Sequence, residues 1–148
     1  MQPVNFSELT KVLQTSISPV ALISGVGLLL LSMTNRLGRT IDRARSLAHE
    51  ARTANGEERE RAVVQIRIIY RRAKNLRLAI ELASVSIFCS CFIIVLIPII
   101  YVADVAMQGV VVFLFVVSLL FLTSALALFI KDVLLSLRAL KYEVEDFL

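Results

Sequence analysis

The stretch TNRLGRTIDRAR, residues 34–45, decides the fold, because it separates the most apolar part of the sequence from the most basic part. Residues 17–33, which precede it, contain no charged side chain. Four arginines then fall within ten residues, at positions 36, 39, 43 and 45. An apolar run of this length is typical of a helix that crosses a membrane. The sequence therefore predicts a membrane boundary at residues 34–45.

Composition extends this prediction to the whole chain. Hydrophobic residues make up 57% of the 148 residues, and the mean hydropathy is +0.79, whereas a soluble domain is typically about 45–50% apolar. The excess is concentrated in three blocks, which predict transmembrane helices at residues 16–34, 78–102 and 110–130. The expected fold class is an all-α integral membrane protein, a single membrane domain with three transmembrane helices.

Residues 35–77, between the first two spans, are predicted to form a basic helical hairpin. In the first arm, apolar residues recur at spacings of four and three: Leu37, Ile41, Ala44, Ala48 and Ala51. The second arm has the same kind of pattern at Ala62, Ile66, Ile69, Ala73, Leu76 and Ile80. Such spacing is typical of helices that pack side by side. Asn55-Gly56 is a turn signal, and the glutamates that follow it suit the first turn of a helix, where the dipole favours negative charge.

The two ends of the chain and the remaining connection also have predicted structures. Residues 1–15 are expected to form an amphipathic segment at the membrane surface, and residues 103–109 a short external loop. Residues 131–148 continue the helical spacing and are predicted to form a C-terminal helix that completes a small three-helix bundle with the hairpin. The acidic end of this helix, residues 143–146, is expected near the arginines of the hairpin tip.

The positions of the basic residues predict the orientation in the membrane. Twelve of the sixteen Lys and Arg residues lie between Asn35 and Arg77, and the C-terminal tail raises the share to fifteen. Basic residues in short loops mark the cytoplasmic side. The hairpin and the C-terminal helix are therefore expected in the cytoplasm, with the N-terminus and the 103–109 loop outside. The same arginines are expected to attract anionic lipid headgroups.

Residues around the first boundary, together with two pairs further on, carry a resemblance. They are PVALISGVG at residues 19–27, TNRLGRTIDRAR at 34–45, Arg71-Arg72 and Ala79-Ile80. The pattern N-R-L-x-R-x-x-D-R-x-R is the most specific part. These strings resemble the domain-of-unknown-function 2721 family, over most of the chain. The resemblance implies a small multi-span protein of the bacterial inner (plasma) membrane with no assigned activity, so it supplies no mechanism.

The first predicted span carries a polar stripe. Because a seven-residue interval drifts only about 20° around a helix, residues spaced by seven share one side. The stripe and the residues close to it are Ser18, Gly25, Ser32, Asn35, Arg36 and Arg39. Two alternatives remain open. The stripe lines a water-filled axis, or it packs against another helix, where small and hydroxyl-bearing residues are favoured.

Two groups of charged residues are further candidate sites. Glu81 lies one turn after Arg77, just inside the second predicted span, where an acid is costly unless it is paired or hydrated. A charge pair between them is expected, with a functional role as the alternative. Asp42 lies three residues after Arg39 and three before Arg45. These three residues are expected to form intrahelical ion pairs or a charged ring at the cytoplasmic mouth of an oligomer.

Several classes of function are disfavoured by what the sequence lacks. It contains no phosphate-binding loop, nucleophile elbow or zinc motif, so no enzyme activity, metal or cofactor is expected. Tyr70 is the only aromatic residue between Phe6 and Phe88. Nucleic-acid binding is therefore not expected, because stacking needs an aromatic platform. Cys89 and Cys91, two positions apart on a helix, point to different sides and do not bridge each other.

Two hypotheses for function follow. In the first, the protein is a homo-oligomeric ion channel or pore with the first span nearest the symmetry axis, because three spans are few for a monomer that encloses a pathway. In the second, it is a membrane-anchored interaction or scaffold module whose basic cytoplasmic bundle binds a protein partner or anionic lipid. The environment of the polar stripe distinguishes the two hypotheses.

Overall fold

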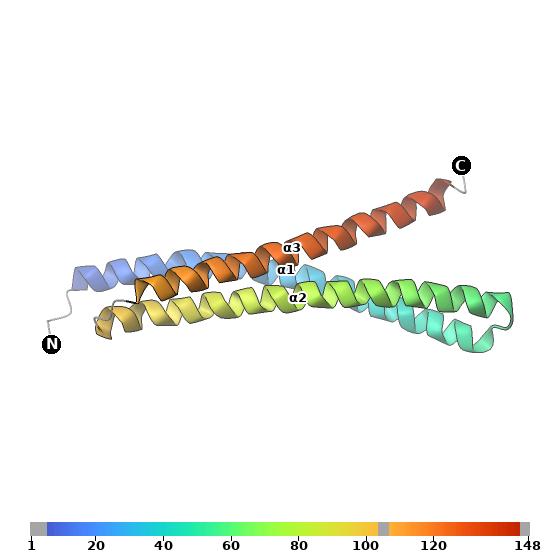
Figure 1. The fold of residues 1–148 in the computed structure, drawn as a ribbon, viewed down its shortest axis with the longest axis horizontal. Coiled ribbons are helices and arrows are strands. Elements are labelled where there is room, and N and C mark those ends of the chain that lie inside the picture. The colour runs from blue at the N-terminus through green and yellow to red at the C-terminus, as the bar shows by residue number, and fades with distance from the viewer. Residues whose placement is uncertain (1–5, 104–106, 146–148) are drawn as a thin grey trace. The chain divides into compact units, whose positions relative to one another are not determined.

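The computed structural model describes residues 6–103 and 107–145, with side chains for residues 10, 14, 20–103 and 107–136. Nearly all of these residues belong to three α-helices (Figure 1), which are α1 (Phe6–Thr53), α2 (Glu57–Ala103) and α3 (Gln108–Glu145). The described part of the chain contains no strand. The prediction of an all-α protein with three long helices is therefore confirmed.

α1 joins three predicted segments into one helix of 48 residues. From Phe6, the helix continues through the predicted first span and through the 34–45 stretch to Thr53. At ~1.5 Å per residue its length is ~72 Å, more than twice the ~30 Å hydrocarbon core of a bilayer. The predicted amphipathic segment is thus continuous with the span from residue 6 onwards.

The turn between α1 and α2 lies at the predicted Asn55-Gly56 pair (Figure 1). Gly56 has a φ of 60°, a left-handed conformation that glycine adopts at low cost. The carbonyl group of Glu50 in the last turn of α1 accepts hydrogen bonds from Ala54 N at 2.9 Å and from Thr53 Oγ1 at 3.0 Å. α2 then begins with three glutamates in its first turn, where the helix dipole favours negative charge.

α2 and α3 both extend beyond the predicted spans. α2 runs for 47 residues and continues past Pro98 to Ala103. α3 begins at Gln108, inside the predicted 103–109 loop, and continues to Glu145. Because no glycine or proline follows Gly109 in the sequence, nothing in the local chemistry ends α3 at the close of the third apolar block. The predicted C-terminal helix is therefore the second half of α3.

The helices divide into two compact units, and each helix contributes to both. Residues 1–30 and 82–123 form the first, which we call the apolar unit because it includes only three of the 28 charged residues. Residues 31–81 and 124–148 form the second, which holds the other 25 and which we call the basic unit, since arginine predominates there. Within α1, the division falls at the end of the apolar run, close to the predicted membrane boundary.

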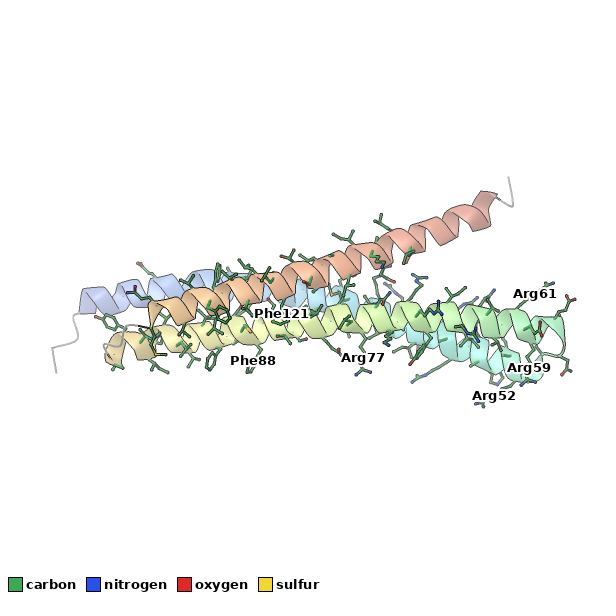
Figure 2. All side chains as sticks on the ribbon, viewed as in Figure 1. Arg52, Arg59, Arg61, Arg77, Phe88 and Phe121 are labelled. Atoms are coloured by element: carbon green, nitrogen blue, oxygen red, sulfur yellow. The ribbon has the colours of Figure 1, made fainter. Side chains whose placement is uncertain are left out.

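In the apolar unit, many large side chains are exposed, and several small ones are buried. Phe88 and Phe113 are 72% and 67% exposed, and Phe88 projects away from α2 (Figure 2). Ala83, Ser86 and Ser118, by contrast, are each 1% exposed. This distribution is the reverse of that in a water-soluble domain. It is typical of helices in lipid, where small residues allow backbones to approach closely.

The basic unit has a small apolar core to which all three helices contribute. Three residues are each at most 1% exposed: Met33 on α1, and Leu76 and Ala79 on α2. Leu128 and Phe129 on α3 are partly buried and pack against this group. The core therefore lies at the end of the hairpin furthest from the turn, where α3 joins the two arms.

Along the hairpin, burial in α1 follows the predicted seam in part, since Ala51 is 8% exposed and Leu37 packs against the core. Leu47 is 4% exposed, although the pattern does not include it, whereas Ile41 is 38% exposed. Arg36 gives a reference direction on α1, because its side chain contacts α3. At 100° per residue, Leu47 lies ~20° from Arg36 around the helix and Ile41 lies ~140° away. The most buried side of α1 in the hairpin therefore lies close to the direction of Arg36. In α2, none of the predicted seam residues is exposed.

Candidate functional site

Asp132, on α3 in the basic unit, is a buried carboxylate that is 5% exposed. One arginine from each of the other two helices contacts it. Arg36 Nη2, on α1, lies 3.2 Å from Asp132 Oδ2, and Arg72 Nε, on α2, lies 3.5 Å from Asp132 Oδ1. The three helices therefore meet at one carboxylate.

A serine one turn further along α3 completes the group. Ser136 Oγ accepts a hydrogen bond from Arg36 Nη2 at 3.0 Å and another from Arg72 Nη2. The Ser136 hydroxyl itself donates to the Asp132 carbonyl oxygen at 2.8 Å. The Arg36 guanidinium also lies 5.7 Å from the centroid of the Phe129 ring, within the range of a cation–π contact. We call Arg36, Arg72, Asp132 and Ser136 the charge cluster.

Burial explains why the charge cluster needs all of its members. A buried carboxylate without partners is costly, and here two cations and their N–H donors compensate the charge of Asp132. The side chains of Arg36 and Arg72 remain 27% and 29% exposed. They therefore keep part of their hydration, which lowers the desolvation cost of forming the two ion pairs. The charge cluster holds both hairpin arms against α3 within the basic unit.

Sequence reasoning identifies only one member of the charge cluster, Arg36, and assigns it to the polar stripe. Asp132 lies 96 residues from Arg36 and 60 residues from Arg72, so no local pattern links them. One signal was available in the sequence. Lys131-Asp132 follows directly on the third apolar run, and a carboxylate at that depth needs a cation from a neighbouring helix.

An open cavity of about 540 Å³ adjoins the charge cluster, between α1 and α2 of the basic unit. Its lining consists of Arg36, Arg39, Thr40, Arg43, Ile69 and Arg72. Four of these six residues are arginines, and none is acidic. We call this cavity the arginine cavity. The four glutamates and one aspartate of the hairpin, residues 35–77, all lie outside its lining.

The four arginines of this cavity are held in different ways. Arg36 and Arg72 are fixed by Asp132. Arg39 and Arg43 are exposed, and neither forms an ion pair with a described residue. They lie four positions apart, on one side of α1. The arginine cavity therefore presents guanidinium groups without a competing carboxylate in its wall, an arrangement suited to an anion.

The remaining members of the predicted polar stripe lie away from the charge cluster. Gly25 and Ser32 are exposed, and a Cβ atom added at Gly25 meets no atom within 4 Å. Asn35 is exposed as well, and the Ser18 side chain lies outside the described residues. Of the stripe, the structure thus brings Arg36 and Arg39 to a shared cavity. It leaves Gly25, Ser32 and Asn35 on the surface.

The other predicted charged residues lie on the hairpin surface. Arg77 Nε lies 2.8 Å from Glu81 Oε1, and the two side chains are 75% and 53% exposed. Arg45 Nη1 lies 3.9 Å from Asp42 Oδ1, with both side chains more than 70% exposed. Among the described residues, Arg39 forms no ion pair with Asp42. Exposed pairs of this kind contribute little to stability.

Three serines of the apolar unit form a group that the sequence analysis does not include. Ser118 Oγ, on α3, donates a hydrogen bond to the Ser86 carbonyl oxygen on α2 at 3.0 Å. It also lies 3.1 Å from Ser86 Oγ and 3.0 Å from Ser90 Oγ. All three side chains are at most 4% exposed. Because each hydroxyl has a partner, this serine cluster serves to pack α2 against α3.

An apolar groove of about 650 Å³ also lies on the hairpin. Its α1 wall includes Ile41, Ala44 and Ala48, which are residues of the predicted seam. Ile41 is exposed, whereas Ala44 and Ala48 are partly buried. The groove therefore lies along one edge of the predicted seam.

The class of the chain follows from its three helices. α1, α2 and α3 each contain a stretch long and apolar enough to cross a membrane, which indicates a multi-pass membrane protein. Comparison with known proteins then gives the family. The chain belongs to the family described as protein of unknown function (DUF2721), whose match covers residues 16–142. This confirms the resemblance found in the sequence. No curated protein and no solved structure matches the chain.

Proposed function

We propose that the protein is a non-enzymatic scaffold of the bacterial inner membrane whose basic unit lies in the cytoplasm and binds anionic lipid. The observation that carries the proposal is the charge of residues 36–77, where twelve basic side chains accompany five acidic ones. Ten of the twelve are exposed. They extend to the tip of the hairpin, where Arg52, Arg59 and Arg61 lie near the turn (Figure 2).

The position of these residues beside the spans supports an interaction with the membrane surface. Basic segments next to spans favour the cytoplasmic side, where anionic lipids make the surface negative. Each Lys or Arg near such a surface contributes about 1 kcal/mol of attraction. The charge cluster holds the hairpin against α3, so the exposed arginines are carried by a packed unit rather than by a flexible tail. In this proposal the second half of α3 completes a small cytoplasmic bundle, and the connection predicted at residues 103–109 lies outside.

Cysteine labelling tests the orientation. In a chain with Cys89→Ala and Cys91→Ala, Asn55→Cys is expected to react with a membrane-impermeant maleimide only after the membrane is opened. Ala106→Cys is expected to react in intact spheroplasts. Labelling of both positions from the same side contradicts the proposed orientation.

Hydrogen exchange tests lipid binding. The full-length protein is compared in nanodiscs of phosphatidylcholine and in nanodiscs that also contain phosphatidylglycerol. Amides of residues 36–77 are expected to exchange more slowly in the anionic discs, and the difference is expected to shrink as added salt screens the charges. Residues 82–102 serve as the internal control. Equal exchange of the hairpin in both discs at low salt contradicts the proposal.

A second candidate function, a homo-oligomeric pore with α1 nearest the axis, is favoured by the exposure of the polar stripe. Gly25 and Ser32 are exposed, and Gly25 has open space around it. Small and polar residues gain little from lipid contact, but they allow helices to approach closely and supply hydrogen bonds between them. A second copy of α1 is the partner that this chemistry suggests.

Assembly and conductance test this second candidate. Gly25→Leu is expected to shift the detergent-solubilised protein towards a smaller species in light scattering, because the added side chain separates the packed helices. Val116→Leu, on the exposed side of α3, is the control and is expected to leave the mass unchanged. If α1 lines a pore, Ser32→Asp alters ion selectivity in planar bilayers. A monomeric unmodified protein contradicts this candidate.

A further inference from the structure

We infer that the arginine cavity is a specific binding site for a phosphate group, supplied by the headgroup of an anionic phospholipid. The inference rests on the proposed function, because it places the cavity at the cytoplasmic surface of the membrane. It goes further than general attraction between a basic hairpin and a negative surface. It assigns recognition to one cavity and to four of the twelve basic residues of the hairpin.

The composition of the arginine cavity is the first observation. Arg36, Arg39, Arg43 and Arg72 contribute to the wall, and no carboxylate does. The nearby Asp132 compensates one of these four charges, so a positive charge remains for a ligand to balance. Guanidinium groups offer planar forks of N–H donors that match the oxygens of a phosphate. The electrostatics and the donor chemistry therefore select the same kind of ligand.

Preorganisation is the second observation. The contacts with Asp132 and Ser136 occupy Nη2 of Arg36, and Nε and Nη2 of Arg72. Each guanidinium has five N–H donors, so both arginines retain donors that these contacts do not use. A side chain already held in place loses less entropy when it binds a ligand. Arg36 and Arg72 form the fixed part of the site.

The free arginines form the other part. Arg39 and Arg43 make no ion pair with a described residue, and they follow each other at one helical turn. Thr40, between them, donates its hydroxyl to the Arg36 carbonyl oxygen at 2.8 Å. The Thr40 hydroxyl proton is therefore already used and is not available to a phosphate. Arg39 and Arg43 are the groups of α1 that can contact a headgroup.

Size and position are consistent with a lipid headgroup. A cavity of about 540 Å³ lies within the range of ~300–1,000 Å³ that small-molecule sites occupy. Arg36 follows the last apolar residue of the first span, Met33, by three positions. In the proposed orientation, three residues of helix place its backbone ~4.5 Å beyond the end of the apolar run. The headgroup region extends ~5–7 Å beyond each face of the hydrocarbon core, so the Arg36 backbone is expected within it.

Ligand-dependent thermal stability of the full-length protein in an uncharged detergent tests the inference. Phosphatidylglycerol, phosphatidylcholine and inorganic phosphate are added separately, because a ligand that binds the folded state raises the melting temperature. Phosphatidylglycerol is expected to raise it in a saturable manner, and phosphatidylcholine is not. The double variant Arg39→Gln/Arg43→Gln is expected to need at least about tenfold more phosphatidylglycerol for the same rise, since two charge-assisted contacts are lost.

Arg67→Gln/Arg71→Gln is the matched control. These arginines are also four positions apart and exposed, on α2 of the same hairpin, but they do not line the arginine cavity. Their loss removes the same charge and is expected to change the response to phosphatidylglycerol less than twofold, a bound set by screening at physiological salt. Equal weakening in both double variants, or no weakening in either, overturns the cavity as a site but leaves the proposed function standing. A melting temperature of the unmodified protein that does not respond to phosphatidylglycerol overturns both.

Two further measurements separate the remaining explanations. Arg39→Lys/Arg43→Lys keeps the charge but removes the forks. It is expected to bind more weakly than the unmodified protein, and binding equal to that of the unmodified protein overturns recognition by guanidinium geometry. If inorganic phosphate alone produces the same saturable rise, and the Arg39→Gln/Arg43→Gln variant loses it, then the phosphate site stands and the lipid as its source is overturned. The melting temperatures without ligand show whether each variant is folded.

Discussion

The apolar unit and the basic unit each bury polar groups between helices, but they bury different kinds. Among the side chains that the structure describes, the buried polar ones are Ser86, Ser90 and Ser118 in the apolar unit and Asp132 in the basic unit. The serines bond to one another and to backbone carbonyl oxygens. Asp132 instead draws an arginine from each neighbouring helix.

This difference follows from the solvent expected around each unit. In lipid, a hydroxyl that bonds to a neighbouring helix leaves no charge to be hydrated, so serines pack helices at low cost. A carboxylate requires a cation nearby, and a cation on a long side chain requires water for its exposed part. The charge cluster is therefore expected at the membrane boundary, where both are available. The serine cluster is expected within the spans.

Removal of the central carboxylate is expected to have the largest effect. Asp132→Ala leaves Arg36 and Arg72 without their counter-charge beside the apolar core. The loss is expected to lower the free energy of unfolding by about 3 kcal/mol, the lower end of the range for a broken buried pair, because both arginines keep some hydration. Titration with sodium dodecyl sulfate measures the loss. Hydrogen exchange is expected to rise in residues 31–81 but not in 82–103.

Asp42→Ala is the control for this prediction. Asp42 is also an aspartate of the basic unit, but its ion pair with Arg45 is 3.9 Å long and exposed. It is expected to change stability by less than about 0.5 kcal/mol. Equal effects of Asp42→Ala and Asp132→Ala would mean that burial does not distinguish the two carboxylates. Faster exchange in both units of Asp132→Ala would mean that they do not open separately.

The rotation of α1 gives the next largest effect. Leu47 is 4% exposed and Ile41 is 38% exposed, although the sequence pattern places Ile41 in the seam. Leu47→Ala is expected to lower the free energy of unfolding by about 2 kcal/mol, at the low end of the range for buried leucines. Ile41→Ala is expected to cost about half as much or less, since part of its surface is already in contact with solvent. A larger loss of stability for Ile41→Ala than for Leu47→Ala would instead support the seam that the spacing predicts.

The long helices and the turn were predictable, because local chemistry determines them. Uninterrupted apolar runs predict spans of ~30 Å, and Asn55-Gly56 followed by glutamates predicts the junction of α1 and α2. The family was also recognisable from contiguous strings of residues. The end of α2 at Ala103 lies one residue beyond the predicted end of the second span, although Pro98 lies inside the helix and proline usually marks a boundary or a kink.

The charge cluster and the rotation of α1 were not predictable, because both depend on a contact between distant residues. The spacing of apolar residues in α1 predicts that the side with Ile41 is buried. No local pattern indicates that the side with Arg36 and Leu47 is buried instead. Asp132 supplies that information, but from 96 residues away. In the sequence, Ser118 is likewise an isolated polar residue in an apolar run. Only the structure shows Ser86 of α2 as its partner. Single-helix patterns thus show which residues are helical, while their partners on other helices decide which side is buried.

A smaller effect is expected in the apolar unit. Ser118→Ala removes the hydrogen bonds that link α3 to Ser86 and Ser90, but it leaves no charge unpaired. Hydrogen bonds between membrane helices contribute about 0.6 kcal/mol on average. The free energy of unfolding is therefore expected to fall by about 0.6–1 kcal/mol. Thr123→Ala, whose hydroxyl bonds within its own helix to the Leu119 carbonyl oxygen, is the control. A loss as large as that for Asp132→Ala would remove the contrast between the units.

The smallest effect is expected for the ion pair of Arg77 and Glu81, which completes the comparison with Asp132. Its 2.8 Å contact is shorter than either contact of Asp132, so distance alone would rank it first. Both side chains are more than half exposed, however, and water screens their attraction. The arginine also precedes the acid, which is the less favourable order on a helix. A double-mutant cycle with Arg77→Gln and Glu81→Gln, read by titration with sodium dodecyl sulfate, is expected to give a coupling of about 0.2–0.5 kcal/mol. A coupling well above that range would show that Glu81 is desolvated by lipid or by a second copy of the chain. The exposure of the pair in the isolated chain would then not describe its environment in the membrane.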